Sequence, residues 1–190
     1  MRNHFVMTLP ALLFFLSGPA TASSPITISV EDLQLLQIEA VRGNADAQNK
    51  LGKLYFLGRN VPQDSTTARE WFEKSAAQGN ADAQNNLGFM YEKEQGDYEK
   101  AKEWYEKAAA QKHAEAQSNL GWLYANGRGI PQDYVRAYMW WKLAAAHSTG
   151  KGEKSEESIL DKVARRMTPG QIAEGQRLIQ QCQTQQFVGC

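Results

Sequence analysis

The chain offers few side chains whose type and spacing would support catalysis or metal binding. Beyond residue 22 it has two histidines, His113 and His147, and neither lies at a metal-ligand spacing from another histidine or a cysteine. No Gly-x-Ser-x-Gly sequence, typical of a nucleophile elbow, occurs. Carboxylates and lysines alternate at helical spacing, for example at Glu99, Glu103 and Lys107, which is typical of a solvated helix face. We therefore expect no enzyme active site, no metal and no cofactor.

Gly150 and Lys151 form the remaining motif with possible chemistry, because a Gly-Lys pair ends a phosphate-binding loop. That loop requires a glycine five residues before Gly150, and the residue there is Ala145. We expect a polar loop at residues 147–154 and no nucleotide site.

Cys182 and Cys190 are the only cysteines of the chain. Seven residues separate them, which is far from the Cys-x-x-Cys spacing of redox motifs. In an exported protein an isolated pair most simply forms a disulfide. That bond would hold the C-terminal tail, including Phe187, against the preceding helix.

The elements that would position these side chains follow from an internal repeat. Residues 43–49 recur without change at residues 79–85, and a looser third copy begins at Lys112. The Leu-Gly pairs of the three copies are 36 and then 33 residues apart, whereas their aromatic pairs are 33 and then 36 apart. The middle copy has therefore lost three residues between its halves, in the loop at residues 94–97. Such a deletion indicates a helix-turn-helix repeat, because a helix that lost three residues would rotate its apolar face.

Each half of the repeat has the signals of a helix. In the first half, Ala47, Leu51, Leu54 and Tyr55 share one face, and a recurring glycine beside them would let a neighbouring helix approach closely. Glycines that can adopt the left-handed conformation would end the first helices, at Gly58 and Gly127. Aspartates would cap the second helices, at Asp64, Asp97 and Asp133. We expect the tryptophans of the second halves to lie in the core, at Trp71, Trp104 and Trp140.

This pattern resembles the Sel1-like repeats (SLR), a branch of the tetratricopeptide superfamily. The resemblance rests on the Ala-x-Ala-Gln-x-x-Leu-Gly-x-x-Tyr half, the Gly-x-Gly-Ile-Pro-Gln-Asp loop and the Ala-x-x-Trp-aromatic-x-x-Ala-Ala half, and it covers about residues 43–146. It implies an all-α, right-handed α-solenoid that serves as a protein–protein adaptor or scaffold, often in the bacterial envelope. We place three repeats at residues 43–78, 79–111 and 112–147.

Capping helices would flank these repeats. Residues 23–42 would supply the N-terminal cap, with a helix that begins at Ser29 and buries Leu33, Leu36, Ile38 and Ala40. Residues 148–190 would supply a C-terminal helical pair and a disulfide-closed tail. The first helix of that pair would span residues 155–167, with Ile159, Leu160, Val163 and Met167 inward. The second would begin after Thr168, with Pro169 at its first position, and would bury Ile172, Leu178 and Ile179.

Residues 1–22 have the pattern of a secretory signal peptide. Arg2 precedes an apolar run at residues 6–16, which is shorter than the roughly 20 residues that a membrane-spanning helix requires. Ala20-Thr21-Ala22 then supplies a small-x-small cleavage pattern. We expect cleavage after Ala22, no transmembrane segment, and a periplasmic or secreted mature chain. An ordinary buried N-terminal helix is the alternative.

The net charge of the chain indicates which class of partner to expect. The chain has 21 basic and 21 acidic residues, and removal of residues 1–22 would leave 20 against 21. A near-neutral chain argues against a nucleic-acid partner, which would favour a basic surface. We expect a monomer that binds a protein or peptide of the cell envelope.

Binding would occur on the concave face of the solenoid, by resemblance to tetratricopeptide geometry. The expected contact positions belong to the first helix of each repeat and are not needed for core packing: Asn49, Lys53, Phe56, Asn85, Phe89, Glu92, Ser118, Trp122 and Asn126. Aromatic side chains that escape the core are typical anchors, and the amides could bond to a peptide backbone. Alternatively, Phe89 and Trp122 pack against neighbouring helices.

The sequence does not exclude two other functions. One is an envelope enzyme or accessory that acts on cell-wall or β-lactam-like ligands. Cysteine-rich relatives of the repeat family are described in that way, but they carry a cysteine pair in each repeat, and the repeats here carry none. The other is a secreted factor that acts on a host protein.

Overall fold

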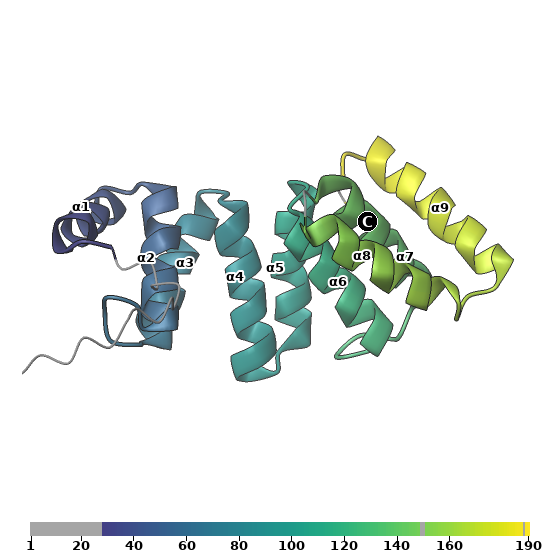
Figure 1. Cartoon of the computed structure of the whole chain (residues 1–190), viewed down its shortest axis with the longest axis horizontal. Coiled ribbons are helices and arrows are strands. Elements are labelled where there is room, and N and C mark those ends of the chain that lie inside the picture. Colours follow the sequence, from purple (N-terminus) through teal and green to yellow (C-terminus); the bar gives the residue numbers. More distant parts are fainter. Residues whose placement is uncertain (1–27, 149–150, 188) are drawn as a thin grey trace, which may run out of the picture.

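The computed structural model describes residues 28–148, 151–187 and 189–190, so the expected signal peptide lies outside the described residues. Every element within these ranges is helical (Figure 1). The elements in chain order are α1 (Val30–Val41), α2 (Ala45–Leu57), α3 (Ser65–Ala77), α4 (Ala81–Met90), the π-helix η1 (Tyr91–Gln95), α5 (Tyr98–Ala110), α6 (Ala114–Asn126), α7 (Tyr134–His147), α8 (Lys151–Ala164) and α9 (Pro169–Thr184).

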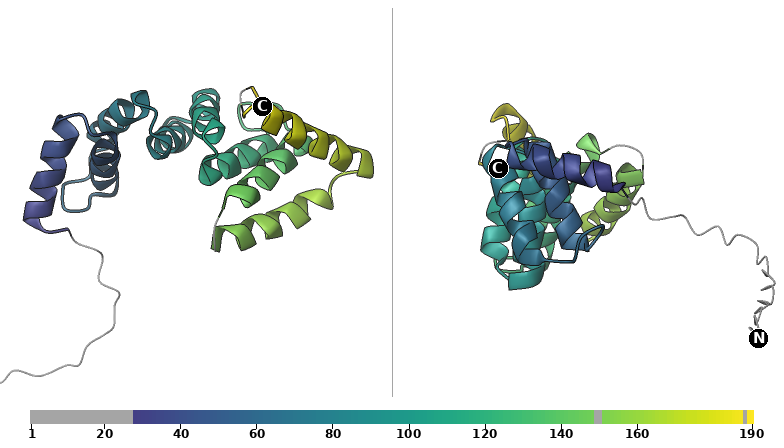
Figure 2. Two further views of the ribbon diagram at one scale, coloured as in Figure 1. Left: turned by 90° about the horizontal axis from the view of Figure 1, so that it is seen from above. Right: turned by 90° about the vertical axis from the view of Figure 1, so that its left-hand side faces the viewer.

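The helices stack as antiparallel pairs into a solenoid, as the sequence predicts. The pairs are α2 with α3, α4 with α5, and α6 with α7, and each helix of the stack packs chiefly on those that precede and follow it. Figure 2 shows the stack as a shallow arc, with α1 at one end and α8 and α9 at the other. This order follows from a repeat that can bury its apolar face only against its neighbours.

The predicted helix ends are confirmed. Asp64, Asp97 and Asp133 cap α3, α5 and α7, and each side chain accepts hydrogen bonds from free backbone N–H groups of the first turn. Gly58 and Gly127 have positive φ angles of 64° and 62° where α2 and α6 end. Since L side chains disfavour that conformation, glycine at these two positions fixes where each first helix stops.

The recurring glycines inside α2, α4 and α6 lie directly against an aromatic ring. A Cβ atom at Gly88 would come within 2.6 Å of the Tyr105 ring, and Gly52 faces Phe72 in the same way. Gly121 repeats the contact with Trp141. The predicted close approach of a neighbouring helix is therefore correct, and the neighbour is the second helix of the same repeat.

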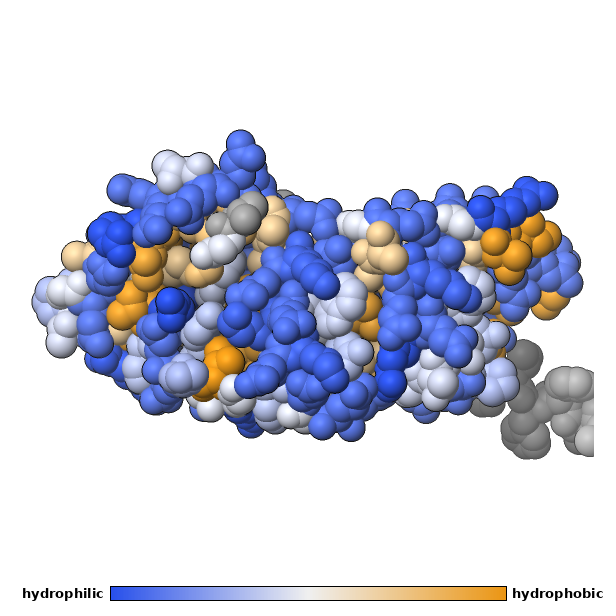
Figure 3. Space-filling view, turned by 180° about the vertical axis from the view of Figure 1, so that it is seen from behind, coloured by the Kyte–Doolittle hydropathy of each residue, from blue (hydrophilic) through white to orange (hydrophobic). Residues whose placement is uncertain are grey.

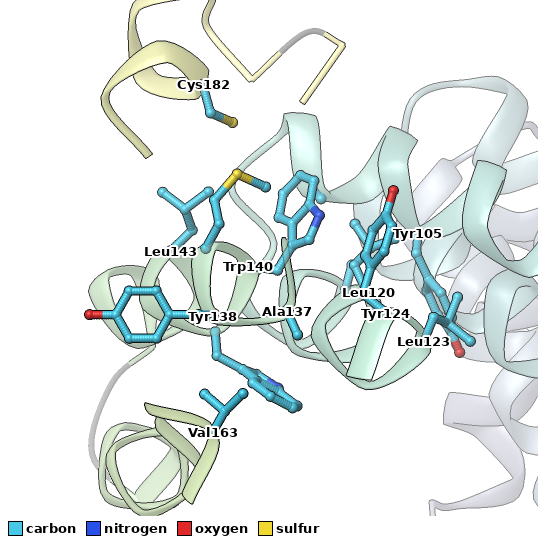
Figure 4. Close-up of a cluster of buried hydrophobic side chains, with 14 of the residues drawn as sticks. Tyr105, Leu120, Leu123, Tyr124, Ala137, Tyr138, Trp140, Leu143, Val163 and Cys182 are labelled. Carbon is cyan, nitrogen blue, oxygen red and sulfur yellow. The ribbon is translucent and has the colours of Figure 1, made fainter. Parts of the chain in front are cut away.

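The buried aromatic of each repeat is thus the second residue of its aromatic pair. Phe72 and Tyr105 are 1% and 0% exposed, while the preceding tryptophans, Trp71 and Trp104, are only half-buried. The prediction that all three tryptophans lie in the core holds for Trp140 alone, which is 1% exposed. Trp140 differs because α9 and the C-terminal tail cover the side of α7 that is open on α3 and α5 (Figure 4).

In the middle repeat, the structure differs from the loop expected at residues 94–97. Tyr91–Gln95 continues α4 as a π-helix, and Gly96, with φ of 64°, then leads directly to the cap at Asp97. Glu94 belongs to the helix and accepts a hydrogen bond of 2.7 Å from the Ser65 hydroxyl of the previous repeat. The three missing residues have therefore removed the extended loop, and a widened last helical turn replaces it.

Both ends of the solenoid depart from the predicted burial or bounds. In α1, Leu33 and Leu36 are partly buried and Ala40 fully, but Ile38 is 47% exposed. At 100° per residue, Ile38 points about 200° away from Leu36 and so cannot share its face. At the other end α8 begins at Lys151 rather than residue 155, because lysine and glutamate favour helix and one glycine is tolerated.

The two C-terminal helices cap the stack by packing on α7 from different sides. Figure 4 places Val163 of α8 on one side of α7 and Cys182 of α9 on the other. The predicted inward residues Leu160, Val163 and Met167 are buried. Thr168 and Gln171 form the predicted capping box at the start of α9. The predicted Cys182–Cys190 disulfide is present, and it brings Phe187 to 7% exposure against the cluster around α7.

Candidate functional site: the inner face

We call the surface formed by α2, α4 and α6 the inner face of the solenoid. Three depressions follow one another along it, with volumes of ≈ 220, ≈ 380 and ≈ 270 Å³. The first lies between α2 and α4, the second between α4 and α6, and the third between α6, α7 and α8. Their order repeats the order of the helical pairs, because each depression forms where two successive units meet.

A row of aromatic side chains connects the depressions. Phe56 and Phe89 line the first, Phe89 and Trp122 line the second, and Trp122 also lines the third. Phe89 is 38% exposed and Trp122 is 49% exposed. The predicted exposure of these two rings is therefore correct.

Each exposed ring is also supported from one side. Phe89 packs edge-on against Phe56, with ring centroids 6.1 Å apart, and Trp122 packs edge-on against Trp141 at 5.4 Å. Such aromatic pairs hold a ring in one orientation while the opposite surface stays accessible. Phe89 and Trp122 thus combine the two alternatives. One side of each ring packs against another ring, and the other side is exposed.

Two of the three asparagines expected on this face, Asn49 and Asn85, are not free to bind a partner. Asn49 and Asn85 are each 4% exposed. The Oδ1 of Asn49 accepts a hydrogen bond of 2.9 Å from Asn86, and that of Asn85 accepts one of 3.0 Å from Asn119. Both bonds join successive repeats, so these amides hold the stack together. The physical reason is that a buried amide must be satisfied within the protein.

Buried glutamines form a second row of hydrogen bonds, which the sequence interpretation missed. Each glutamine bonds to the second helix of its own repeat and also donates to the preceding unit, as Gln84 Nε2 does to the Ala76 carbonyl at 3.3 Å. Gln48 and Gln84 accept hydrogen bonds of 2.7 and 2.8 Å from the glutamines at positions 78 and 111. In the last repeat Gln117 instead accepts from His147 Nδ1 at 2.9 Å. The sequence did contain a signal for these bonds, namely the Ala-Gln pair that recurs in each repeat. A glutamine that recurs at a buried position of a helix requires a hydrogen-bond partner inside the protein.

The remaining predicted contact residues differ in accessibility. Lys53 and Asn126 are exposed, and Ser118 is half-buried. Glu92 is half-buried and accepts a 3.1 Å hydrogen bond from the Tyr105 hydroxyl. Burial raises the pKa of Tyr105, and the negative charge of Glu92 adds to that shift. Asn126 donates a 2.8 Å hydrogen bond to the Trp122 carbonyl. Lys53, Phe56, Phe89, Trp122 and Asn126 thus remain as accessible candidates.

The third depression extends the inner face beyond the repeats, and sequence reasoning did not find it. Its apolar lining includes Trp141, Ile159 and Val163, and Lys162 and Arg166 of α8 add two cations. Since α8 lies outside the repeat, no recurring position could indicate its contribution. This end of the inner face is therefore both apolar and basic.

The outer side of the solenoid presents its aromatics differently. The ammonium of Lys74 lies 4.3 Å from the centroid of the Trp71 ring, and that of Lys107 lies 3.9 Å from that of Trp104. A shallow depression of ≈ 700 Å³ on this side is lined by Lys102, Glu106 and the C-terminal tail. Lys102 and Glu106 pair with each other at 2.6 Å. On this side Trp71, Trp104, Lys102 and Glu106 thus already have partners within the chain.

Among the described residues, no three acidic, histidine or cysteine side chains are grouped so as to hold a metal ion. None of the described helices has the length and apolar character required to cross a membrane.

The chain matches known proteins over the repeats. The family model described as "Sel1 repeat" matches residues 45–80, 81–113 and 114–148. A Sel1 repeat protein from Oxalobacter formigenes is 33% identical, with a TM-score of 0.57, and the match covers 68% of this chain and 99% of that one. The family model thus finds three repeats, and the described chain is an all-α solenoid, as predicted.

Two further relatives are similar over smaller parts of their own length. A protective antigen of uropathogenic Escherichia coli with an SLR fold is 26% identical, with a TM-score of 0.44, over 83% of this chain and 42% of that one. A component of an ERAD-associated E3 ubiquitin-protein ligase, HRD3A of Arabidopsis thaliana, is 44% identical over 46 residues. That match covers 24% of this chain and 7% of the plant protein.

Proposed function

Because the chain belongs to the Sel1 repeat family, whose members generally act in protein–protein interaction, we propose that it is a non-enzymatic adaptor that binds a peptide segment of a partner protein on its inner face. The observation that carries this proposal is the aromatic row Phe56, Phe89 and Trp122. These rings stand in successive depressions, and each is held by a second ring or by the repeat beneath it.

The chemistry of the face indicates the kind of segment that would fit. Large, preoriented aromatic side chains bind apolar side chains with little loss of conformational entropy. Five cations line the row, against two carboxylates, Glu92 and Glu115. The cations are Lys53, Lys93, Arg128, Lys162 and Arg166. We therefore propose an extended segment whose apolar side chains alternate with acidic ones.

We further propose that binding takes place outside the cytoplasm. The Cys182–Cys190 disulfide is compatible with export, because such bonds persist in oxidising compartments. The signal-peptide pattern of residues 1–22 is the second support. Envelope proteins of a bacterium are the expected partners.

The test compares two double variants, each of which replaces two aromatic residues by alanine. Phe89→Ala with Trp122→Ala removes two inner rings, and Trp71→Ala with Trp104→Ala removes two outer rings. Peptides would be selected from a random display library against the wild-type chain, and their affinities measured by calorimetry after circular dichroism confirms that each variant is folded. We expect the inner variant to lose about 30-fold or more in affinity, since each anchor contributes on the order of 1 kcal/mol or above.

Loss in the outer variant with retention in the inner one would contradict the proposal. In cells, crosslinking and capture from the envelope fraction would then identify the natural partner, with the same two variants as controls. A protein captured by the wild type and the outer variant, but not by the inner variant, is the expected result.

A further inference from the structure

The first helix carries a second apolar face that nothing in the described chain covers. Of the seven large apolar side chains exposed in the described residues, four belong to α1, namely Val30, Leu35, Ile38 and Val41. Figure 3 shows apolar side chains gathered at the end of the molecule where α1 lies. Ile38 and Val41 line a shallow depression of ≈ 440 Å³ on this helix.

This face lies opposite the one that packs on α2. At 100° per residue, Leu35, Ile38 and Val41 fall within about 60° of the direction of Ile38, whereas Leu36 and Ala40 point the other way. Glu31 and Arg42 fall in the same outward sector, within about 40° of Ile38. The outward stripe therefore comprises Glu31, Gln34, Leu35, Ile38, Val41 and Arg42, with opposite charges at its two ends.

The centre of the stripe and its two charged ends are self-complementary. Leu35 and Ile38 are equally far from the midpoint of the helix segment, and so are Glu31 and Arg42, because both pairs of residue numbers have the same mean. If α1 lies antiparallel to the α1 of another molecule about that midpoint, Leu35 faces Ile38 of the second copy. Glu31 then lies beside Arg42 of the second copy at both ends. A two-fold axis requires this kind of reciprocal match.

We propose that the occupant of this stripe is a second copy of the chain, docked antiparallel through α1 to form a symmetric dimer. This proposal departs from the monomer expected from the sequence. A single helix face is smaller than the standard interface of about 800 Å² per partner, so the dimer dissociates at roughly micromolar concentrations. The inference does not depend on the inner face, but a dimer would present two inner faces to one partner and increase avidity.

The test is the mass of the full chain in solution, as it accumulates in its cell and with its N-terminus identified by mass spectrometry. Sedimentation equilibrium from about 1 to 500 μM brackets the dissociation constant expected for so small an interface. We expect the mass to rise from one chain toward two. Ile38→Glu should leave a single chain at every concentration, because it places a carboxylate against Leu35 of the second copy. Leu57→Glu is the matched control, since Leu57 is 51% exposed on α2, and it should dimerise as the wild type does.

A charge exchange tests the antiparallel orientation. Glu31→Arg should weaken the dimer about tenfold, because it places two cations together at both ends. Adding Arg42→Glu to that variant should recover most of the affinity. A single chain throughout the concentration range, a dimer that survives Ile38→Glu, or failure of the second change to rescue the first would overturn the proposal.

Discussion

The two ends of the solenoid differ in how completely their terminal helices are covered. At the C-terminal end α8 and α9 cover α7 from two sides, and the Cys182–Cys190 disulfide folds the tail back so that Phe187 is 7% exposed. At the N-terminal end a single helix, α1, covers α2 with Leu33, Leu36 and Ala40. It leaves Leu35, Ile38 and Val41 exposed on its outward side.

The difference follows from the way a solenoid buries its core. Each repeat completes the core of its neighbour, so the terminal repeats need caps whose outer surfaces are polar. The C-terminal cap satisfies this requirement within the chain. The N-terminal cap does not, which is why the same class of side chain is expected to govern stability at one end and association at the other.

The largest contrast should appear when an apolar side chain is removed at each end. Trp140→Ala leaves a cavity between α7, α9 and the tail and should cost about 3–5 kcal/mol of unfolding free energy. Ile38→Ala at the opposite end should change it by no more than about 0.5 kcal/mol, because Ile38 is 47% exposed. Urea denaturation at a concentration where the chain is monomeric measures both. Equal losses would mean that the ends are packed alike.

Removal of the disulfide should have an intermediate effect. Replacing both partners, Cys182→Ser with Cys190→Ser, should lower the free energy of unfolding by up to about 2.5 kcal/mol on the loop-entropy model. Hydrogen exchange should accelerate in the tail and the last turns of α9 while α1 is unchanged. Acceleration at α1 instead would show that the two ends are coupled.

The smallest expected effect is a pH dependence confined to the C-terminal end. Partial burial, with a contribution from the charge of Lys112, holds the pKa of His147 below its ordinary value of 6.5. The unfolded chain then takes up a proton before the folded one does, so stability falls as the pH drops below about 6.5 and levels off below the folded pKa. No histidine lies in the N-terminal half of the described chain.

His147→Gln is the control for that effect, because glutamine keeps a hydrogen-bonding group near Gln117 without a titrating one. The difference in unfolding midpoint between pH 8 and pH 5 should be smaller in this variant than in the wild type. A wild type that becomes more stable in the same interval would contradict the assignment.

Most of the fold could be predicted because the repeat supplies three independent copies of each signal. The aspartate caps, the glycines at Gly58 and Gly127 and the close-approach glycines recur in register, and each was placed correctly. The π-helix at Tyr91–Gln95 could not be predicted, since only the middle copy has it. The start of α8 and the exposure of Ile38 lie outside the repeats, where a single copy gives no comparison.

The candidate site was predicted in part for a related reason. Phe89 and Trp122 stood out because large aromatics at variable positions have no core register to fill. Asn49 and Asn85 were misplaced because amides at those positions suit either solvent or a buried bond to the next repeat. Only the packing distance between repeats decides between the two, and the sequence does not contain that distance.

The most direct test of binding at the inner face places a photo-reactive benzoylphenylalanine at one aromatic position at a time. Trp122, on the inner face, and Trp104, on the outer side, would be replaced in separate chains expressed in the native cell and irradiated. Adducts with a partner protein at position 122, without the same adducts at position 104, are the predicted result. Adducts at position 104 and none at position 122 would place the binding surface on the opposite side and contradict the proposal.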